Sequence, residues 1–180
     1  MNLETVSNMA GDDSGNPILS KVDKIPADLP DEAITALVDT REQLPLDLPW
    51  LTQQRATLPT GDYSVKGLEN HIAIERKSLP DLVACCGRER QRFDREIQRL
   101  LAYPVRCLVI ESDWPEIEAG GWRGKMRPRQ VGASLISWQV RGLPICLAGD
   151  RDRAARLVAS MLRRATIHRW RELRAFANTI

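Results

Sequence analysis

Short apolar runs, separated by turn residues and by charged segments of helical period, occupy most of this chain. The runs at 33–38, 105–111 and 143–148 have the length and composition of buried strands. Two shorter runs, at 63–66 and 71–74, flank a Gly-Leu-Glu-Asn turn and predict a β-hairpin. The pattern therefore predicts a sheet that begins with closely spaced strands and ends with strands joined by helices.

Helical periodicity dominates the segments between and after these strands. Residues 79–86 predict a short helix, and 88–102 predict a longer one with an apolar stripe. A short helix is predicted to begin within 112–116, another spans 130–141, and a long final helix follows Asp150. This order of elements predicts the α/β class, with a mixed central β-sheet flanked by helices.

Charge and composition divide the chain into two parts. Residues 1–32 contain two lysines against seven acidic residues, a net charge of −5, whereas the remaining 148 residues carry +7. The first part is rich in Asp, Ser, Asn, Gly and Pro and shows little periodicity, which predicts a flexible acidic N-terminal leader. Residues 33–180 are long enough to form one domain around a single core.

Several functional classes are excluded by what the pattern lacks. No segment has the length and hydropathy of a membrane span, and the N-terminus has no signal-peptide pattern. The cysteines have no metal-ligand spacing, and neither histidine has a partner at ligand spacing. We therefore predict a cytoplasmic protein with reduced cysteines and no zinc site.

The first candidate chemistry lies at the two ends of the predicted hairpin. Asp62 precedes its first strand, and Glu75-Arg76-Lys77 follows its second. Carboxylate oxygens are the ligands that Mg²⁺ prefers, and Lys77 adds a cation that can steady an attacking water or a phosphate. Strand alternation places Glu75 and Lys77 on one face and Arg76 on the other. These residues predict a metal-dependent phosphodiester nuclease; a solvated strand edge is the alternative interpretation.

A second charged cluster follows the apolar run at 33–38. Asp39, Arg41 and Glu42 lie where this strand leaves the sheet, a position at which ligand sites of open α/β sheets gather. The alternative interpretation is that Asp39 only caps a turn.

These segments together resemble a known family. Val38-Asp39-Thr40-Arg41-Glu42, Gly61-Asp62 and the segment from Glu75 to Asp81 match, in order, V-D-x-R-E, G-D and E-R-K-x-x-x-D. This is the signature of the XPF/Mus81-type nucleases, which carry the ERCC4 domain and belong to the PD-(D/E)xK superfamily. The resemblance runs from about Ala33 to about Ala165 and implies the restriction-endonuclease-like form of the α/β fold.

The resemblance also implies roles for individual residues. It implies catalysis by Asp39, Glu42, Asp62, Glu75 and Lys77. It implies Mg²⁺ or Mn²⁺ held by Asp39, Asp62, Glu75 and the backbone carbonyl of Arg76. Glu42 either adds a ligand through water or fixes Arg41. Arg41 and Arg76 have phosphate or structural roles, and their side chains are then available to the scissile or neighbouring DNA phosphates. Asp81 matches the signature too, but Ser78-Leu79-Pro80-Asp81 also reads as a capping box that opens the helix at 79–86.

The segment 120–129 is a second candidate for contact with DNA. It carries Arg123, Lys125, Arg127 and Arg129, and no acidic residue occurs from Gly120 to Gly149. A basic loop that presents an exposed aromatic, here Trp122, suits phosphates and an unstacked base. The alternative is a solvated connector.

The function expected from these features is hydrolysis of DNA at a flap, fork or junction during repair or recombination. The resemblance implies a homodimer formed through the C-terminal helices. No helix-hairpin-helix module follows the final helix, so a compact bacterial or phage form, acting at the nucleoid, is expected. A resolvase-like or sequence-directed nuclease on the same fold and a catalytically inactive DNA-binding scaffold remain as alternatives.

Overall fold

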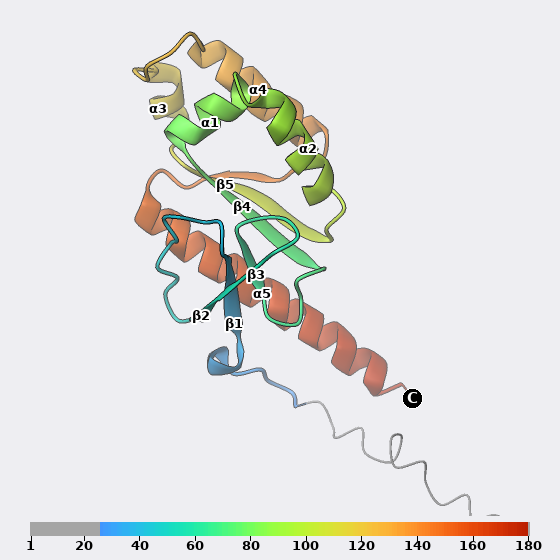
Figure 1. The fold of residues 1–180 in the computed structure, drawn as a ribbon. Coiled ribbons are helices and arrows are strands. Elements are labelled where there is room, and N and C mark those ends of the chain that lie inside the picture. The colour runs from blue at the N-terminus through green and yellow to red at the C-terminus, as the bar shows by residue number, and fades with distance from the viewer. Residues whose placement is uncertain (1–25, 180) are drawn as a thin grey trace, which may run out of the picture.

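A six-stranded mixed β-sheet forms the centre of the protein, in a computed structural model that describes residues 26–179 (Figure 1). The sheet order is β2-β1-β3-β4-β5-β6. Pairing is antiparallel between β1 and β3 and between β3 and β4, and parallel elsewhere. The strands are β1 (Thr35–Asp39), β2 (Thr52–Ala56), β3 (Tyr63–Val65), β4 (Ile72–Ser78), β5 (Val105–Glu111) and β6 (Ile145–Leu147).

Helices cover both faces of this sheet, as Figure 1 shows. One face carries four of them: α1 (Leu79–Cys86), α2 (Arg90–Leu100), α3 (Trp114–Ala119) and α4 (Pro128–Val140). The opposite face carries α5 (Arg151–Ala177) alone, and a short 3-10 helix, η1 (Asp31–Ala33), precedes β1. The predicted mixed sheet flanked by helices is confirmed.

Each face of the sheet has its own hydrophobic core. Val38, Ile74 and Val109 pack toward α5 and meet Val158 and Leu162. The other core is formed by apolar residues that point toward the four-helix layer, with Phe93 and Trp138 in edge-to-face contact at 5.0 Å; it includes Ala73, Leu108, Ile110, Leu82 and Ile97. Side chains alternate between these cores along β4 and β5, because successive strand residues point to opposite faces.

The sequence pattern missed strand β2. It pairs in parallel with β1, Thr35 opposite Thr52 and Asp39 opposite Ala56. Four of its five residues are exposed, since it is the edge strand and neither face enters a core. Its polar sequence therefore has no apolar alternation to detect, and only its pairing with β1 makes it a strand.

Other boundaries shift by a few residues. Helix α2 begins at Arg90 instead of residue 88, and α4 begins at Pro128, inside the predicted basic segment. Pro128 suits the first turn of a helix because its missing N–H would have no partner there. The side chain of Gln130 accepts a hydrogen bond from Arg127 N at 2.9 Å and thereby caps the N-terminus of α4.

The end of the predicted leader packs against α5. Asp31 pairs with Arg163 at 2.6 Å, and Pro26 accepts a hydrogen bond from the Trp170 indole at 2.9 Å. Leu29 adds an apolar contact to the core beneath α5. Residues 1–25 of the predicted leader lie outside the described residues. Among residues 26–179, no helix is long and apolar enough to cross a membrane.

Candidate active site

Main-chain hydrogen bonds bring the separate motifs together at one end of the sheet. Asp39 N donates to Asp62 O at 2.8 Å, and Asp62 N donates to Ile74 O at 2.9 Å. Gly61 makes this approach possible: its φ is +79°, and a Cβ there would lie 3.1 Å from Ile74 O. Asp62 is therefore held between β1 and β4, beside Glu75.

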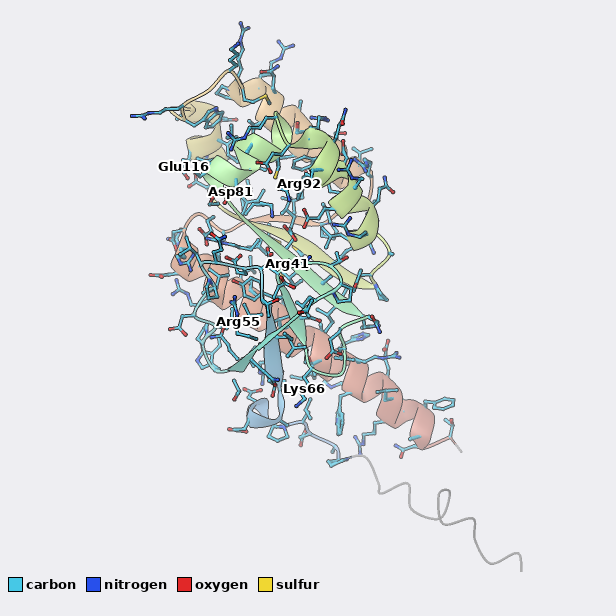
Figure 2. The ribbon with its side chains drawn as sticks, viewed as in Figure 1. Arg41, Arg55, Lys66, Asp81, Arg92 and Glu116 are labelled. Carbon is cyan, nitrogen blue, oxygen red and sulfur yellow. The ribbon has the colours of Figure 1, made fainter. Side chains whose placement is uncertain are left out.

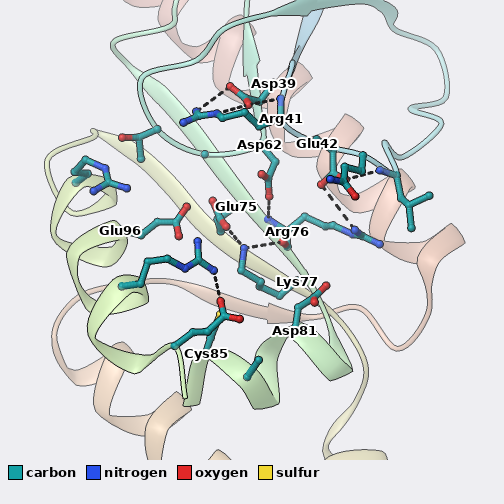
Figure 3. Close-up of a pocket in the computed structure, with 18 of the residues that line it drawn as sticks. Asp39, Arg41, Glu42, Asp62, Glu75, Arg76, Lys77, Asp81, Cys85 and Glu96 are labelled. Atoms are coloured by element: carbon teal, nitrogen blue, oxygen red, sulfur yellow. Dashed lines mark hydrogen bonds and ion pairs between the residues drawn. The ribbon is translucent and has the colours of Figure 1, made fainter. Parts of the chain in front are cut away.

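An open pocket of about 590 Å³ lies over this junction. We call it the active-site pocket. The predicted residues Asp39, Arg41, Glu42, Asp62, Glu75, Arg76 and Lys77 all line it, together with Asp81 and residues of α2 (Figure 3). The structure therefore places every predicted catalytic and metal-binding residue around one cavity.

Glu75 and Lys77 form a buried ion pair that lines this pocket. Their side chains point the same way from β4 and pair directly, as the strand alternation predicts. The Lys77 Nζ also lies 5.4 Å from the centre of the Phe93 ring, within the range of a cation–π contact. Glu75 is 1% exposed, and its second oxygen, Oε2, has no hydrogen-bond partner. A buried carboxylate oxygen without a partner is costly, and a bound cation would relieve that cost.

Asp62 faces the same space from the loop before β3. Its Oδ2 accepts a hydrogen bond from Arg76 N at 2.8 Å. Burial raises the pKa of Asp62 to about 6, against the lowering effect of Lys77. Burial and the neighbouring Asp62 carboxylate likewise raise the pKa of Glu75 well above its usual range. Two carboxylates that repel each other in a poorly solvated pocket favour the binding of a cation between them.

Asp39 is engaged in a different way. Its Oδ1 accepts from Arg41 N at 2.8 Å and Arg41 Nε at 2.7 Å, and its Oδ2 accepts from Arg41 Nη2 at 3.0 Å and Leu58 N at 2.7 Å. Burial alone would raise the pKa of Asp39, but these hydrogen bonds outweigh it and the pKa is lowered. Its side chain is therefore a charged carboxylate that braces Arg41, and ligation of a metal by Asp39 stays a prediction.

Arg76 points to the opposite side of β4, as predicted, and is 8% exposed. Its guanidinium pairs with Glu111 at 2.7 Å and lies 3.8 Å from Glu42. Glu42 therefore faces Arg76. Of its two predicted roles, fixing Arg41 is wrong, because Asp39 holds Arg41, and ligation through water stays a prediction. Phosphate binding by Arg76 stays a prediction, and in this arrangement its side chain joins β4 to β5 and to the loop after β1.

These donors fit a hard divalent cation. Among residues 26–179, no three His, Cys, Asp or Glu side chains group closely enough to hold a metal ion. Mg²⁺ commonly takes only one or two protein carboxylates and completes its shell with waters and substrate phosphate. Asp62, Glu75 with its free Oε2 and the Arg76 carbonyl, which lies 3.3 Å from Lys77 Nζ, supply a donor set of this kind.

Helix α2 also contributes residues to the pocket; its sequence predicts a charged side whose unpaired arginines are candidates for contact with the DNA backbone, but no motif links that side to this site. Arg92, Glu96 and Arg99 line the pocket. Glu96 points toward Glu75 in Figure 3, and its charge contributes to the raised pKa values of Asp62 and Glu75. The period of α2 placed these residues on its polar face, but only the packing of Phe93 and Ile97 turns that face toward β4.

Ser78 and Asp81 form the predicted helix cap. Ser78 Oγ donates to Asp81 Oδ2 at 2.6 Å and accepts from Asp81 N at 3.4 Å. Asp81 thus stabilises the start of α1 while also lining the active-site pocket.

The predicted basic segment lies apart from the active-site pocket. None of Arg123, Lys125, Arg127 and Arg129 lines that pocket; Arg127 caps α4 and Arg129 lies in its first turn. The side chains of this segment project from the end of the molecule near α3 (Figure 2). The expectation that Trp122 is exposed is wrong: it is half-buried, and its indole donates to Met126 O at 2.9 Å.

Comparisons with known proteins identify a similar fold and a domain family. A search of curated protein sequences finds no match. Two solved structures of XPF from Aeropyrum pernix, one of them in complex with DNA, superpose with a TM-score of 0.59 at 22% identity. Each covers 73% of this chain, and the chain spans 61% and 64% of their respective lengths. The ERCC4 domain model matches residues 38–161, so the chain belongs to the ERCC4 domain family.

Proposed function

We propose that this protein is a DNA endonuclease that hydrolyses phosphodiester bonds with Mg²⁺ or Mn²⁺. The observation that carries the proposal is the buried Glu75 Oε2, which has no partner although it lies in a pocket with Asp62 and Lys77. Membership of the ERCC4 domain family supports the same chemistry. A buried carboxylate oxygen without a partner, beside a second carboxylate, favours a bound cation.

The predicted residues have separate tasks in this reaction. Asp62, Glu75 and the Arg76 carbonyl would hold the metal, with Asp39 and Glu42 as the further acidic members. When bound there, the metal would lower the pKa of a water and offset charge on the phosphate. Lys77, fixed by Glu75 and Phe93, orients the attacking water or stabilises the charge that develops on the phosphate.

Arginines at the mouth of the pocket supply contacts to the DNA backbone. Arg41 has a 67% exposed side chain, although its Nε and Nη2 pair with Asp39. Arg92 and Arg99 lie across the pocket on α2. A DNA strand that passes between Arg41 and α2 would place a phosphate above Glu75. We propose branched or partly single-stranded DNA as the substrate, in repair or recombination, and hence action in the compartment that holds the DNA.

Exposed apolar side chains near the end of α5 support a homodimer. Leu173 is 44% exposed and Phe176 is 65% exposed. We propose that two copies pair through these C-terminal turns. Phe176→Asp should then shift the mass measured by light scattering from dimer to monomer, whereas Arg171→Asp, also on an exposed position of α5, should leave a dimer. A monomeric wild-type protein would contradict this part of the proposal.

The test of the nuclease activity is a cleavage assay with Mg²⁺ or Mn²⁺ on duplex, flap, fork, splayed-arm and four-way DNA. We expect cleavage by the wild-type protein, none in EDTA, and none by Asp62→Ala. Thermal melting of Asp62→Ala confirms that the variant is folded. If no substrate is cut with either metal, or if Asp62→Ala cuts at the wild-type rate, the assignment fails.

The same assay separates the proposal from its rivals. Asymmetric cleavage beside a branch supports a structure-specific nuclease. Symmetric cleavage of an intact duplex or a four-way junction supports a sequence-directed or resolvase-like enzyme on the same fold. Binding of DNA without cleavage, under every metal condition, supports an inactive scaffold.

A further inference from the structure

A second pocket lies on the other side of helix α1. It has a volume of about 660 Å³, within the range of ligand-binding sites. We call it the loop pocket. Its lining comes from α1 and the residues directly after it and from the segment 122–126 between α3 and α4. Ala84 lines both this pocket and the active-site pocket, so α1 is the wall between the two.

Apolar side chains form the body of the loop pocket. Val83 of α1 faces Trp122 and Met126 of the loop, and both loop residues also pack against the core beneath α1. The Trp122 indole donates to Met126 O at 2.9 Å, which closes the loop on itself. Met126 also packs closely on Gly87, where an added Cβ would lie 3.0 Å from Met126 Cγ. The aromatic ring is therefore held in place at the pocket.

Positive charges surround this apolar surface. Arg88, Arg123 and Lys125 line the same pocket. Arg88 lies 3.6 Å from Glu89, but no acidic residue occurs in the sequence between Gly120 and Gly149. An apolar ligand without charge would gain nothing from these cations, and a simple anion would gain nothing from Trp122 and Met126. The occupant that fits both is apolar on its faces and anionic at its edge.

We infer that the loop pocket holds one unstacked nucleotide of the DNA strand whose phosphate lies in the active-site pocket. Its base packs on Trp122 and Met126, and its phosphates lie against Arg123 and Lys125. Aromatic side chains bind any base through its π-face, while basic groups follow the backbone. The inference rests on the proposed nuclease function and narrows it. The substrate must have an unpaired nucleotide within reach of the scissile phosphate, separated from it by the width of one helix.

The test removes one base at a time from the DNA. A labelled splayed-arm substrate carries a single abasic site, moved stepwise through the nucleotides on both sides of the fork. Binding is measured by fluorescence anisotropy without divalent metal, and cleavage of the unmodified DNA is measured in parallel with Mn²⁺. We expect one position at which the loss of the base raises the Kd about fivefold or more, since stacking on a side chain is worth about 1–3 kcal/mol per base.

Variants of the loop pocket then test whether this rise in Kd comes from the loss of a base bound there. We call the rise in Kd on loss of the base the abasic penalty. In Trp122→Ala the abasic and intact substrates should bind with equal Kd, because the base has lost its partner. Trp114→Ala removes a 41% exposed tryptophan of α3 that does not line the loop pocket, and should retain the full penalty. Met126→Ser repeats the test on a second side chain, so the assignment does not depend on the folding of Trp122→Ala alone.

The outcomes separate this inference from the proposed function. If the wild-type protein cuts DNA but shows no abasic penalty at any position, the loop pocket does not hold a base and the inference is wrong. The same follows if the penalty persists in both Trp122→Ala and Met126→Ser. If the wild-type protein neither binds nor cuts any DNA, the nuclease function itself fails and the inference fails with it.

Discussion

The two pockets on either side of α1 are similar in size and opposite in construction. The active-site pocket is lined mainly by charged groups, which come from strand ends, from a loop tied to them by main-chain hydrogen bonds, and from α1, α2 and their connection. The loop pocket is lined mainly by apolar groups and basic residues, which come from α1, the residues directly after it and the glycine-containing segment 122–126. Buried charges must be held in fixed positions to be tolerated, and a rigid sheet provides this for the charges of the strand ends. The apolar surface that we propose for a base needs less accuracy, because every base offers a π-face.

The two pockets also differ in whether their charged side chains have partners of opposite charge. Inside the active-site pocket, Lys77 pairs with Glu75, Arg41 with Asp39, and Glu42 faces Arg76. Around the loop pocket, the exposed Arg123 and Lys125 have no acidic neighbour in sequence. We therefore expect large effects when the paired, buried charges of the first region are removed, and small effects when charges of the basic segment 123–129, which borders the second, are removed.

The largest effect is expected for Glu75→Gln. The amide keeps the shape of the side chain but replaces the free Oε2 charge that we assign to the metal. Because metal catalysis supplies several kcal/mol, the cleavage rate should fall by about a thousandfold or more. Glu118→Gln is the control, since Glu118 is exposed on α3 and does not line the active-site pocket, and its rate should stay within about twofold. A Glu75→Gln protein that cuts normally would show that catalysis occurs elsewhere.

The second largest effect is expected for Lys77→Met. Its kcat should fall by about 10²- to 10³-fold, the usual loss for one group that stabilises developing charge. The side chain of methionine preserves contact with Phe93 but leaves the buried Glu75 carboxylate without its cation, so thermal melting is needed to show that the variant is folded at the assay temperature. Steady-state kinetics are expected to show the loss in kcat and little change in KM. Lys66→Met, at an exposed position beside the hairpin turn, should have wild-type kinetics. An equal rise in KM would instead assign Lys77 to substrate binding.

Arg76→Met tests how much the buried ion pairs beside the active-site pocket contribute to the stability of the fold. It leaves Glu42 and Glu111, about 10% exposed each, without their buried cation. We expect the free energy of unfolding in urea to fall by about 3 kcal/mol, in the range for one partner removed from a buried pair. Arg151→Met removes the more exposed partner of Glu111, which lies 3.3 Å away, and should cost less than about 1 kcal/mol. Equal losses in the two variants would show that burial does not strengthen the Arg76 contacts.

The smallest effects belong to the basic segment. Arg127→Ala and Arg129→Ala should each weaken DNA binding about equally for all sequences and flatten the dependence of log K on log salt by about one unit. Anisotropy titrations between low and moderate salt measure this slope. Arg156→Ala, on the exposed side of α5, is the control and should leave the slope unchanged. An unchanged slope for Arg127→Ala and Arg129→Ala would remove this segment from the DNA interface.

Local pattern was sufficient for much of the fold and for the centre of the site. Strand alternation alone places Glu75 beside Lys77 and turns Arg76 away, and the short hairpin returns Asp62 to Glu75. The cap formed by Ser78 and Asp81 is equally local. These features depend on backbone geometry over a few residues, which the amino-acid sequence specifies directly.

Other features depend on contacts between distant segments, and they were missed or wrongly assigned. Strand β2 exists because β1 pairs with it, and Glu42 faces Arg76 because the loop after β1 folds over β4. Trp122 is half-buried because its loop closes on α1.

The sequence by itself determined the class of the fold, the acids and the lysine of the site, and the family to which the chain belongs. The tertiary structure decided which carboxylate is braced by an arginine and which is left with a free oxygen. It also decided that α1 separates a charged pocket from an apolar one. These properties arise from burial and from long-range pairing, because the cost of a charge and the value of an apolar surface depend on which distant side chains exclude water from it.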